Sequence, residues 1–377
     1  MSEFLLPESP ESITIQDEKF IVRQPLVSVC MITYNHAPYI AQAIEGVLQQ
    51  ETDFPVELVI GEDCSTDGTR EIVFDYQKRY PETIRVVTSE TNVGMWANSR
   101  RTHVACRGKY MTFCEGDDQW HHPKKIKKQV EYLESHPKCG LVHSDVDVLE
   151  VLTGERIHNR RMTLEVACKD DDLELSWWIL SGQYPIWTCT VCARKNLVDD
   201  VYSANPEVFQ EDRFKMGDLP LWFELSRLAR VHYIDESLVT YRVLAESASR
   251  SRDICKQLRF LLSGRDVRLY YIDKYSCPPG MRRTILEARN RTLLSTAYEA
   301  RDSQVAEDAA SELRKLGVEL TPYERMLLFG SHPLGSMFVR PIVFSKTLPT
   351  RIASRLRRMV CGNRSKSRFN SCGKDSQ

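Results

Sequence analysis

The chain has 377 residues, 42% hydrophobic and 27% charged, a composition typical of a folded globular protein and not of a disordered one. Lys and Arg number 51 against 52 Asp and Glu, and the net charge of -1 gives no reason to expect nucleic acid or another acidic polymer as a partner. The N-terminus lacks the basic and apolar stretches of a signal peptide, and no run of about 18 apolar residues occurs, so we expect a cytoplasmic protein.

Twelve cysteines are scattered along the chain, which favours reduced, buried thiols over a disulfide framework. Cys189 and Cys192 form the one C-x-x-C pair, inside the stretch IWTCTVCAR, which is typical of a strand. Residues three apart in a strand point to opposite faces, and no second C-x-x-C supplies two more ligands. We therefore predict core thiols here and no zinc site.

Apolar segments alternate with helical patterns from residue 26 to residue 117. The predicted strands are Leu26–Thr33, Val56–Asp63, Thr83–Ser89 and Lys109–Asp117. The first is followed by a helix with Ile40, Ala43, Ile44, Val47 and Leu48 on one face. Strands and helices that alternate over short connections predict an α/β fold, with a mostly parallel sheet flanked by helices.

Polar residues follow three of these strands at the point where each one ends. They are Thr33, Tyr34 and Asn35 after the first strand, Glu62 and Asp63 after the second, and Glu115, Asp117 and Asp118 after the fourth. An acid after a strand is often only a turn residue or a helix cap. In parallel sheets, however, ligands bind beyond the carboxyl ends of the strands, so all three groups are candidates for one site.

The stretch FCEGDDQW, residues 113–120, places three acids close together after an apolar run. Two like charges about 4 Å apart at an effective dielectric of about 20 repel by roughly 4 kcal/mol. A water-poor cluster of this kind is costly unless a positive charge lies beside it. A divalent cation is the ligand that this pattern indicates.

The later sequence contains further elements. Residues 139–150 are typical of a strand, and residues 151–172 are polar and irregular, as in a flap or hairpin. Asp218–Arg230 predicts an amphipathic helix, with Leu221, Trp222, Leu225 and Leu228 on one face, and Val231–Val243 predicts a strand. Residues 253–329 are helical and charged, without a motif that we can assign.

Five motifs in this order and at this spacing resemble the family-two inverting glycosyltransferases, which have the GT-A fold. They are VSVCMITYNHAPYI, LVIGEDCSTDGT, NVGMWANSRR, GKYMTFCEGDDQW and GDLPLWFELSRLARVHYIDESLVTYRV. The resemblance covers about Pro25 to Ser249. It divides the chain into an N-terminal extension (1–24), a glycosyltransferase domain (25–250), a helical appendage (251–330) and a basic tail (331–377), which is either flexible or bound at a membrane surface.

The resemblance implies a nucleotide-sugar site. Thr33, Tyr34 and Asn35 would cradle the nucleotide, Asp63 with Glu62 would bind the base or ribose, and Asn92 and Gly94 would contact the donor. Glu115, Gly116 and Asp117 match the Asp-x-Asp element that holds the diphosphate through Mg²⁺ or Mn²⁺. Glu115 stands where the family has its first Asp, so Asp117 is the preferred metal ligand and Glu115 the second.

The same resemblance implies a carboxylate base for the acceptor hydroxyl, at Asp218 in GDLPLW. Glu211 and Asp212 are the rival candidates, although they lie too early for the motif. The structural alternative is that Asp218 caps its helix.

Several other side chains leave two interpretations open. The family's His after Tyr-Arg is absent beyond Tyr241-Arg242, so the metal has fewer protein ligands or Ser247 or Ser249 substitutes through water. Arg242 either contacts phosphate or forms a structural ion pair. His121 and His122 fit a solvated loop better than a metal site. Trp222 fits the core, and Trp187 either lines an acceptor cleft or packs inside the protein.

The C-terminal segment from Arg340 onward contains ten Lys and Arg, and Asp375 is its one acid. It is typical of peripheral contact with an anionic membrane, or equally of a solubilising tail. The sequence thus predicts a metal-dependent transferase that moves a hexose-type sugar, most simply from a UDP-sugar, to a saccharide or lipid-linked saccharide in surface polysaccharide synthesis. A non-catalytic nucleotide-sugar-binding module and, less well supported, a nucleotidyltransferase are the alternatives.

Overall fold

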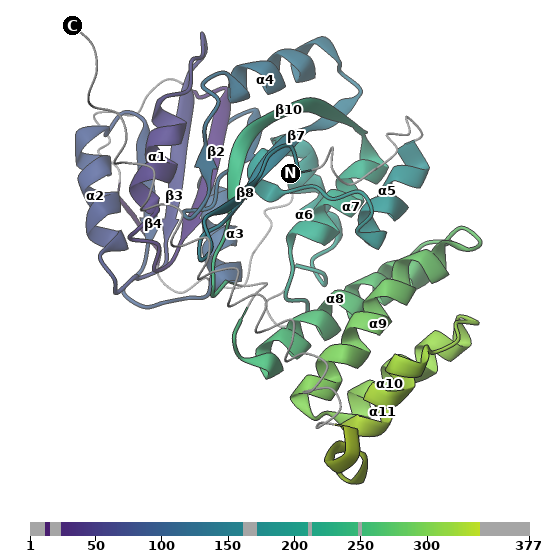
Figure 1. Cartoon of the computed structure of the whole chain (residues 1–377). Coiled ribbons are helices and arrows are strands. Elements are labelled where there is room, and N and C mark those ends of the chain that lie inside the picture. The colour runs from purple at the N-terminus through teal and green to yellow at the C-terminus, as the bar shows by residue number, and fades with distance from the viewer. Residues whose placement is uncertain (1–11, 16–23, 161–171, 210–212, 248–250, 340–377) are drawn as a thin grey trace, which may run out of the picture. The chain divides into compact units, whose positions relative to one another are not determined.

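The structure is a computed structural model, and it describes residues 12–15, 24–160, 172–209, 213–247 and 251–339 (Figure 1). Two compact units divide the chain, one ending at Leu286 and the next beginning at Glu287. The domain boundaries predicted at residues 24, 250 and 330 stay predictions. The basic tail from Arg340 lies outside the described residues, as do Glu211, Asp212 and Ser249.

The first unit is built on one sheet of ten described strands. Their order is β1-β4-β3-β2-β5-β9-β7-β10-β6, with β8 paired to β7. The strands are β1 (Ile13–Ile15), β2 (Val27–Thr33), β3 (Val56–Glu62), β4 (Ile84–Thr88), β5 (Tyr110–Phe113), β6 (Gln119–Trp120), β7 (Cys139–Glu150), β8 (Glu155–Ile157), β9 (Cys192–Arg194) and β10 (Arg230–Val243). β2 pairs in parallel with both β3 and β5, so the tails of these three strands reach the same edge.

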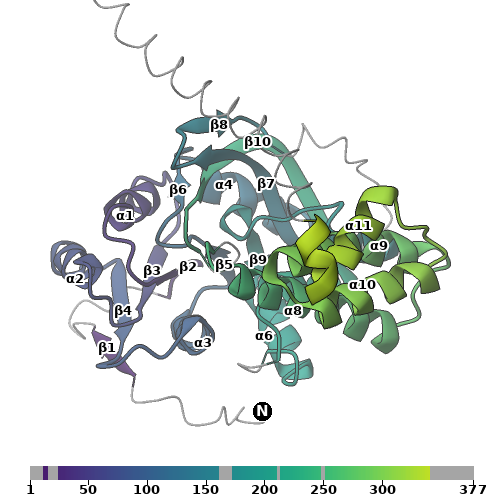
Figure 2. The same cartoon turned by 60° about the horizontal axis from the view of Figure 1, so that its bottom comes forward.

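Helices cover both faces of this sheet, which confirms the predicted fold class (Figure 2). α1 (Ile40–Leu48), α2 (Thr69–Arg79) and α4 (Lys125–Ser135) pack on one face, and α3 (Met95–Ala105) packs on the other. β-Branched and other apolar residues occupy both faces of β2, as expected for a strand covered on each side. The predicted strands Leu26–Thr33, Val56–Asp63, Thr83–Ser89 and Lys109–Asp117 are confirmed, with ends shifted by up to four residues.

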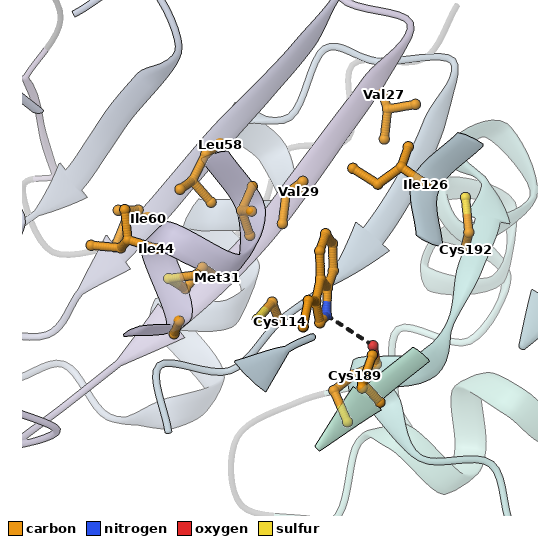
Figure 3. Packing of buried hydrophobic residues seen from close by; sticks show 14 of the residues in the cluster. Val27, Val29, Met31, Ile44, Leu58, Ile60, Cys114, Ile126, Cys189 and Cys192 are labelled. Atoms are coloured by element: carbon orange, nitrogen blue, oxygen red, sulfur yellow. Dashed lines mark hydrogen bonds between the residues drawn. The ribbon is translucent and has the colours of Figure 1, made fainter. Parts of the chain in front are cut away.

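The core between the sheet and α1 contains the C-x-x-C pair (Figure 3). Cys189 and Cys192 are buried free thiols, as predicted, and the Trp120 indole donates to the Cys189 carbonyl over 3.1 Å. The prediction of one strand through IWTCTVCAR was wrong. Thr188–Thr190 forms a 3-10 turn, and the strand begins only at Cys192 because β9 pairs with β5 and β7 from there.

The remaining helices of the first unit support the late strands. They are α5 (Asp172–Ser181), α6 (Lys195–Ala204), α7 (Asp218–Leu228) and α8 (Ile254–Lys274). The predicted helix at Asp218 is confirmed, but Leu228 is 56% exposed, whereas the seven residues from Pro220 to Ser226 are all buried. α7 is enclosed rather than amphipathic, because α5, α6 and β7 pack around it and the Phe223 ring packs at a tilt against Tyr271 of α8.

The hairpin expected between residues 151 and 172 is present in its described part, where β8 pairs antiparallel with β7. Residues 161–171 lie outside the described residues. The second unit consists of the C-terminal part of α9 (Met281–Ala300), α10 (Ser303–Lys315), α11 (Pro322–Ser331) and the residues that follow. α11 starts with a capping box, in which Thr321 and Glu324 exchange hydrogen bonds.

No helix in the described ranges is long and apolar enough to cross a membrane. The cytoplasmic location expected from the sequence stays a prediction.

Lys125 is fully buried at the start of α4, and no carboxylate of the described residues forms an ion pair with it. Its ammonium donates to the Thr112 hydroxyl over 3.1 Å and to the Gln129 amide over 2.9 Å, and it lies 4.0 Å from the Trp120 ring centroid. Desolvation lowers the pKa of Lys125 to about 8. Above about pH 8 the folded protein therefore loses the Lys125 proton, whereas the unfolded chain keeps this proton up to the ordinary lysine pKa of 10.5.

We expect the free energy of unfolding of the wild type to rise, relative to that of Lys125→Met, between pH 8 and 10.5. In that window the unfolded wild type binds one more proton than the folded state, so the slope is at most about 1.4 kcal/mol per pH unit. Urea unfolding across the window measures it. Lys124→Met, which removes the neighbouring exposed lysine, is the matched control. Parallel curves for the wild type and Lys125→Met would contradict the assignment.

Candidate functional site

A cavity of about 1240 Å³ lies in the first unit beyond the ends of β2, β3 and β5. Nine of the eleven site residues predicted from the sequence line it: Thr33, Tyr34, Asn35, Asp63, Asn92, Gly94, Glu115, Asp117 and Asp218. They come from five separated segments of the chain. The parallel pairing of the three strands and the position of α7 bring these segments together.

The turn after β2 is held rigidly. Asn35 has a left-handed backbone with φ of 56°, a conformation that Asn tolerates better than most residues. Its backbone N–H donates to the Ser65 hydroxyl over 3.0 Å, and its side-chain oxygen accepts from the Thr66 N–H over 2.9 Å. These bonds tie the turn after β2 to the turn after β3. Tyr34 is left 44% exposed at the cavity.

Asp63 organises the next loop. Its two carboxylate oxygens accept from the backbone N–H groups of Val93 (2.8 Å) and Gly94 (3.0 Å), and its carbonyl accepts from the Asn92 side chain. Arg101 lies 3.5 Å away as an ion-pair partner. Asp63 thus lines the cavity and also positions the Asn92–Gly94 segment, so its carboxylate is fixed before any ligand arrives.

Glu62, predicted beside Asp63 as a donor-binding residue, does not line the cavity. Its side chain is fully buried. One carboxylate oxygen accepts from the Ser65 N–H over 2.6 Å, and the other accepts from the Thr88 hydroxyl over 3.0 Å, with Arg70 3.6 Å away. Successive residues of a strand point to opposite faces, which separates Glu62 from the site.

The acids after β5 lie close together in a poorly hydrated wall. Desolvation raises the pKa of Glu115 to about 8, and the neighbouring charge of Asp117 adds to the increase. Desolvation also raises the pKa of Asp118, which is 1% exposed. The Asp118 carboxylate accepts from the backbone N–H of Arg242 over 2.9 Å, so it joins this turn to β10.

Gly116, predicted as part of the diphosphate-binding element, makes its close approach to protein atoms. A Cβ at this position would lie 2.5 Å from the Thr33 hydroxyl and 2.9 Å from Nδ1 of His36. Glycine is required because the turn after β5 crosses the end of β2. The Gly116 N–H donates to the Ile32 carbonyl over 3.0 Å at this crossing.

Arg242 has a structural role, and its guanidinium does not line the cavity. It donates to the Asp117 carbonyl over 2.9 Å and to the side chains of Gln119 and Gln42. His121 is held by Thr240 and Ser237 of β10, each at 3.0 Å, and His122 lies 3.1 Å from Glu236. Neither histidine lines the cavity.

Asp218 is the first residue of α7, and the cap position is occupied by Gly217. One Asp218 carboxylate oxygen accepts from the Leu219 N–H over 2.8 Å. The side chain is exposed into the cavity, yet the walls surround it closely enough that desolvation raises its pKa. Its charge contributes to the raised pKa of Glu115, so the two carboxylates share one electrostatic environment.

Other lining residues had no recognisable motif in the sequence. The cavity is lined by Tyr184, Lys215, Lys256, Arg259 and Phe260, together with Trp187, for which a cleft position was one of two interpretations. Lys256, Arg259 and Phe260 come from α8, in the segment predicted as a separate appendage. Their charge and aromatic character are common on any helix, so only the tertiary structure indicates their place. Trp222 also lines the cavity, although it is 2% exposed and packs edge-on to Phe113.

The acidic wall suits a hard divalent cation. Oε2 of Glu115 is buried and has no hydrogen-bond partner among the described residues, so this oxygen is available to a ligand. In the described ranges no group of three His, Cys, Asp or Glu side chains could hold a metal by itself. Mg²⁺ is usually bound by one or two carboxylates together with substrate phosphates, and Glu115 and Asp117 fit this kind of site.

The sheet order and its flanking helices are those of the GT-A glycosyltransferase fold. The crystal structure of S. aureus TarS residues 1–349 in complex with UDP-GlcNAc shares this fold, with a TM-score of 0.52, 16% identity, and coverage of 81% of this chain and 79% of that one. Residues 28–178 match the family model described as glycosyl transferase family 2. The resemblance to this family, expected from the motifs, is thereby confirmed.

Curated relatives match parts of the same segment. The protein Rv1520 of Mycobacterium tuberculosis is 42% identical over 123 residues, which is 33% of this chain and 36% of that protein. The putative teichuronic acid biosynthesis glycosyltransferase TuaG of Bacillus subtilis is 38% identical over 110 residues, 29% of this chain and 42% of its own length. The chain therefore spans well under half the length of these relatives.

We expect the free energy of unfolding of the metal-free protein to fall, relative to that of Glu115→Gln, as the pH rises from 4.5 to about 8. In this window the folded protein keeps a proton on Glu115 that the unfolded chain has released, so the sign is opposite to that for Lys125, with at most about 1.4 kcal/mol per pH unit. Denaturant titrations in the presence of a chelator measure the difference. A difference that does not change with pH would show that Glu115 is well hydrated.

Proposed function

We propose that this chain is a glycosyltransferase that moves a sugar from a nucleoside-diphosphate donor to a hydroxyl of a saccharide acceptor. The observation that carries the proposal is that Asp63, Glu115, Asp117 and Asp218, from distant parts of the chain, line one cavity. The match to glycosyl transferase family 2 supports the same reaction class. The volume of about 1240 Å³ has room for a nucleotide-sugar and part of an acceptor.

The donor would lie along the tails of β2, β3 and β5. Tyr34 and the fixed Asn35 turn would contact the nucleoside, and Asp63 would accept hydrogen bonds from base or ribose while it holds the Asn92–Gly94 loop. Glu115 and Asp117 would hold Mg²⁺ or Mn²⁺. When bound, such an ion neutralises the charge that develops on the departing diphosphate. UDP is the nucleotide we propose as the first to test.

Asp218 is the proposed general base. It is exposed into the cavity, its side chain forms no ion pair with another described residue, and desolvation raises its pKa, which makes the carboxylate a stronger base. It would take the proton of the acceptor hydroxyl while that oxygen bonds to the anomeric carbon. The bond from this carbon to the diphosphate oxygen breaks, and its electron pair leaves with the nucleoside diphosphate. One direct displacement of this kind inverts the anomeric centre.

The acceptor would enter beside α8. Tyr184 and Trp187 line the cavity, as do Lys215, Lys256 and Arg259, and no ion pair joins these three cations to another described residue. Aromatic faces and cationic donors suit a saccharide that carries negative charge. The relative named for teichuronic acid biosynthesis supports an acceptor in surface polysaccharide synthesis, saccharide or lipid-linked.

A second candidate is a module that binds a nucleotide-sugar without transferring it. Glu115 in place of the family's first Asp favours this candidate, because a carboxyl with a pKa of about 8 is largely protonated at neutral pH when no cation is bound. Binding without metal-dependent release of nucleoside diphosphate would support the module.

Asp218→Asn should reduce turnover by about 10² to 10⁴-fold and leave donor affinity within about twofold, because the amide keeps the shape of the side chain but cannot take a proton. A donor is first chosen by thermal stabilisation with a panel of nucleotide-sugars. Release of nucleoside diphosphate is then measured with Mn²⁺. Asp235→Asn removes an exposed acid of β10 outside the cavity and is the control. Wild-type turnover in Asp218→Asn would remove the base assignment.

UDP and Mn²⁺ together should raise the Tm of the wild type more than UDP alone does. Asp117→Asn should abolish this extra increase. The wild type should gain several degrees in Tm with UDP and Mn²⁺ together compared with UDP alone, since a ligand at about 100 times its Kd contributes about 2.7 kcal/mol. The measurement is a thermal unfolding scan with each ligand alone and with both. An unchanged metal effect in Asp117→Asn would place the cation elsewhere.

A further inference from the structure

The second unit ends in an exposed apolar face. Residues 333–339 are helical, and Leu334, Met337 and Phe338 are 77%, 74% and 69% exposed. These are the three largest exposures of any large hydrophobic side chain in the described part of the chain. Their spacing of three and four residues places them on one side of the helix. Phe329 at the end of α11 is 54% exposed as well.

Close packing against α11 fixes the direction of this face. A Cβ at Gly335 would lie 1.9 Å from the Phe329 carbonyl oxygen and 3.0 Å from Cδ1 of its ring. A Cβ at Gly330 would lie 2.8 Å from the Val339 side chain, which is 3% exposed. The two glycines therefore let the short helix lie directly on α11, with Gly335 and Val339 inward. Leu334, Met337 and Phe338 are left on the solvent side, next to Phe329.

The sequence directly after this face is strongly basic. From Arg340 to the last residue there are ten Lys and Arg and one acid, Asp375. A second copy of the chain docked on the apolar face would bring two such segments close to each other, at an electrostatic cost. Both the apolar face and the basic sequence after it fit a partner that has an anionic outer layer and an apolar interior. Lipid bilayers with acidic headgroups have this character.

We propose that Phe329, Leu334, Met337 and Phe338 form a membrane-docking face that enters the headgroup region of a bilayer containing anionic lipid, whose charge is opposite to that of the ten Lys and Arg that follow in the sequence. In such interfacial contacts the free energies of apolar burial and of electrostatic attraction add together. At physiological salt neither contribution alone holds the protein on the membrane. The proposal is independent of the reaction in the cavity.

Co-sedimentation of the full chain with vesicles tests the docking face. One set of vesicles contains phosphatidylcholine with phosphatidylglycerol, and the other contains phosphatidylcholine alone. We expect the wild type to bind the first set more strongly. The triple variant Leu334→Asp/Met337→Asp/Phe338→Asp should lose at least about tenfold in partitioning. Leu152→Asp, at a turn residue that is 66% exposed, is the matched control for adding an acid at an exposed apolar site and should bind like the wild type.

Thermal unfolding and donor-dependent stabilisation of the triple variant, both expected to equal those of the wild type, show that it is folded. Three results would overturn the proposal. One is equal binding of the triple variant and the wild type to anionic vesicles, which would assign binding to the basic segment alone. Another is equal binding of the wild type to both vesicle sets. The third is a wild-type dimer in light scattering that the triple variant dissociates, which would assign the face to a second copy of the chain.

Discussion

The repulsion among the acids after β5 is the constraint around which the site is arranged. Glu115, Asp117 and Asp118 lie within four residues of one another, and desolvation together with the neighbouring charge of Asp117 raises the pKa of Glu115 to about 8. The protein compensates only part of this charge. Asp118 is satisfied by the Arg242 backbone N–H, whereas one oxygen of Glu115 has no partner among the described residues. The remaining imbalance is what a cation and a diphosphate would relieve together.

The fold tolerates this arrangement because the rest of the site is rigid. Asp63 uses both carboxylate oxygens to hold Val93 and Gly94, and Asn35 locks the turn after β2 to the turn after β3. Arg242, which could have served as a phosphate ligand, instead joins Asp117 to Gln119 and Gln42. A catalytic acid or base must keep its geometry to within a fraction of an ångström. The residues around the cavity contribute that order, and Asp218 is the residue that we propose exchanges the proton.

Much of this architecture could be predicted from the sequence. Alternating strand and helix patterns predict a parallel sheet, and a parallel sheet brings the tails of β2, β3 and β5 to one edge. Finer points needed the tertiary structure. Glu62 and Asp63 are adjacent acids, and only the register of β3 shows that one is enclosed and the other faces the cavity. Gly116 signals a close approach, but the sequence does not say whether the neighbour is a ligand or Thr33. The contribution of Lys256 and Arg259 could not be foreseen, since basic residues on a helix are usually only solvated.

The central claim is that the carboxylates at this edge of the sheet bind one cation that holds a nucleoside diphosphate. A crystal structure of the protein grown with UDP and Mn²⁺, with anomalous data collected for manganese, tests it most directly. The account predicts one anomalous peak at coordination distance from Asp117, with diphosphate oxygens on the same ion and the nucleoside between Tyr34 and Asp63. A peak outside the cavity, or a diphosphate bound there by lysine and arginine side chains alone, would contradict it.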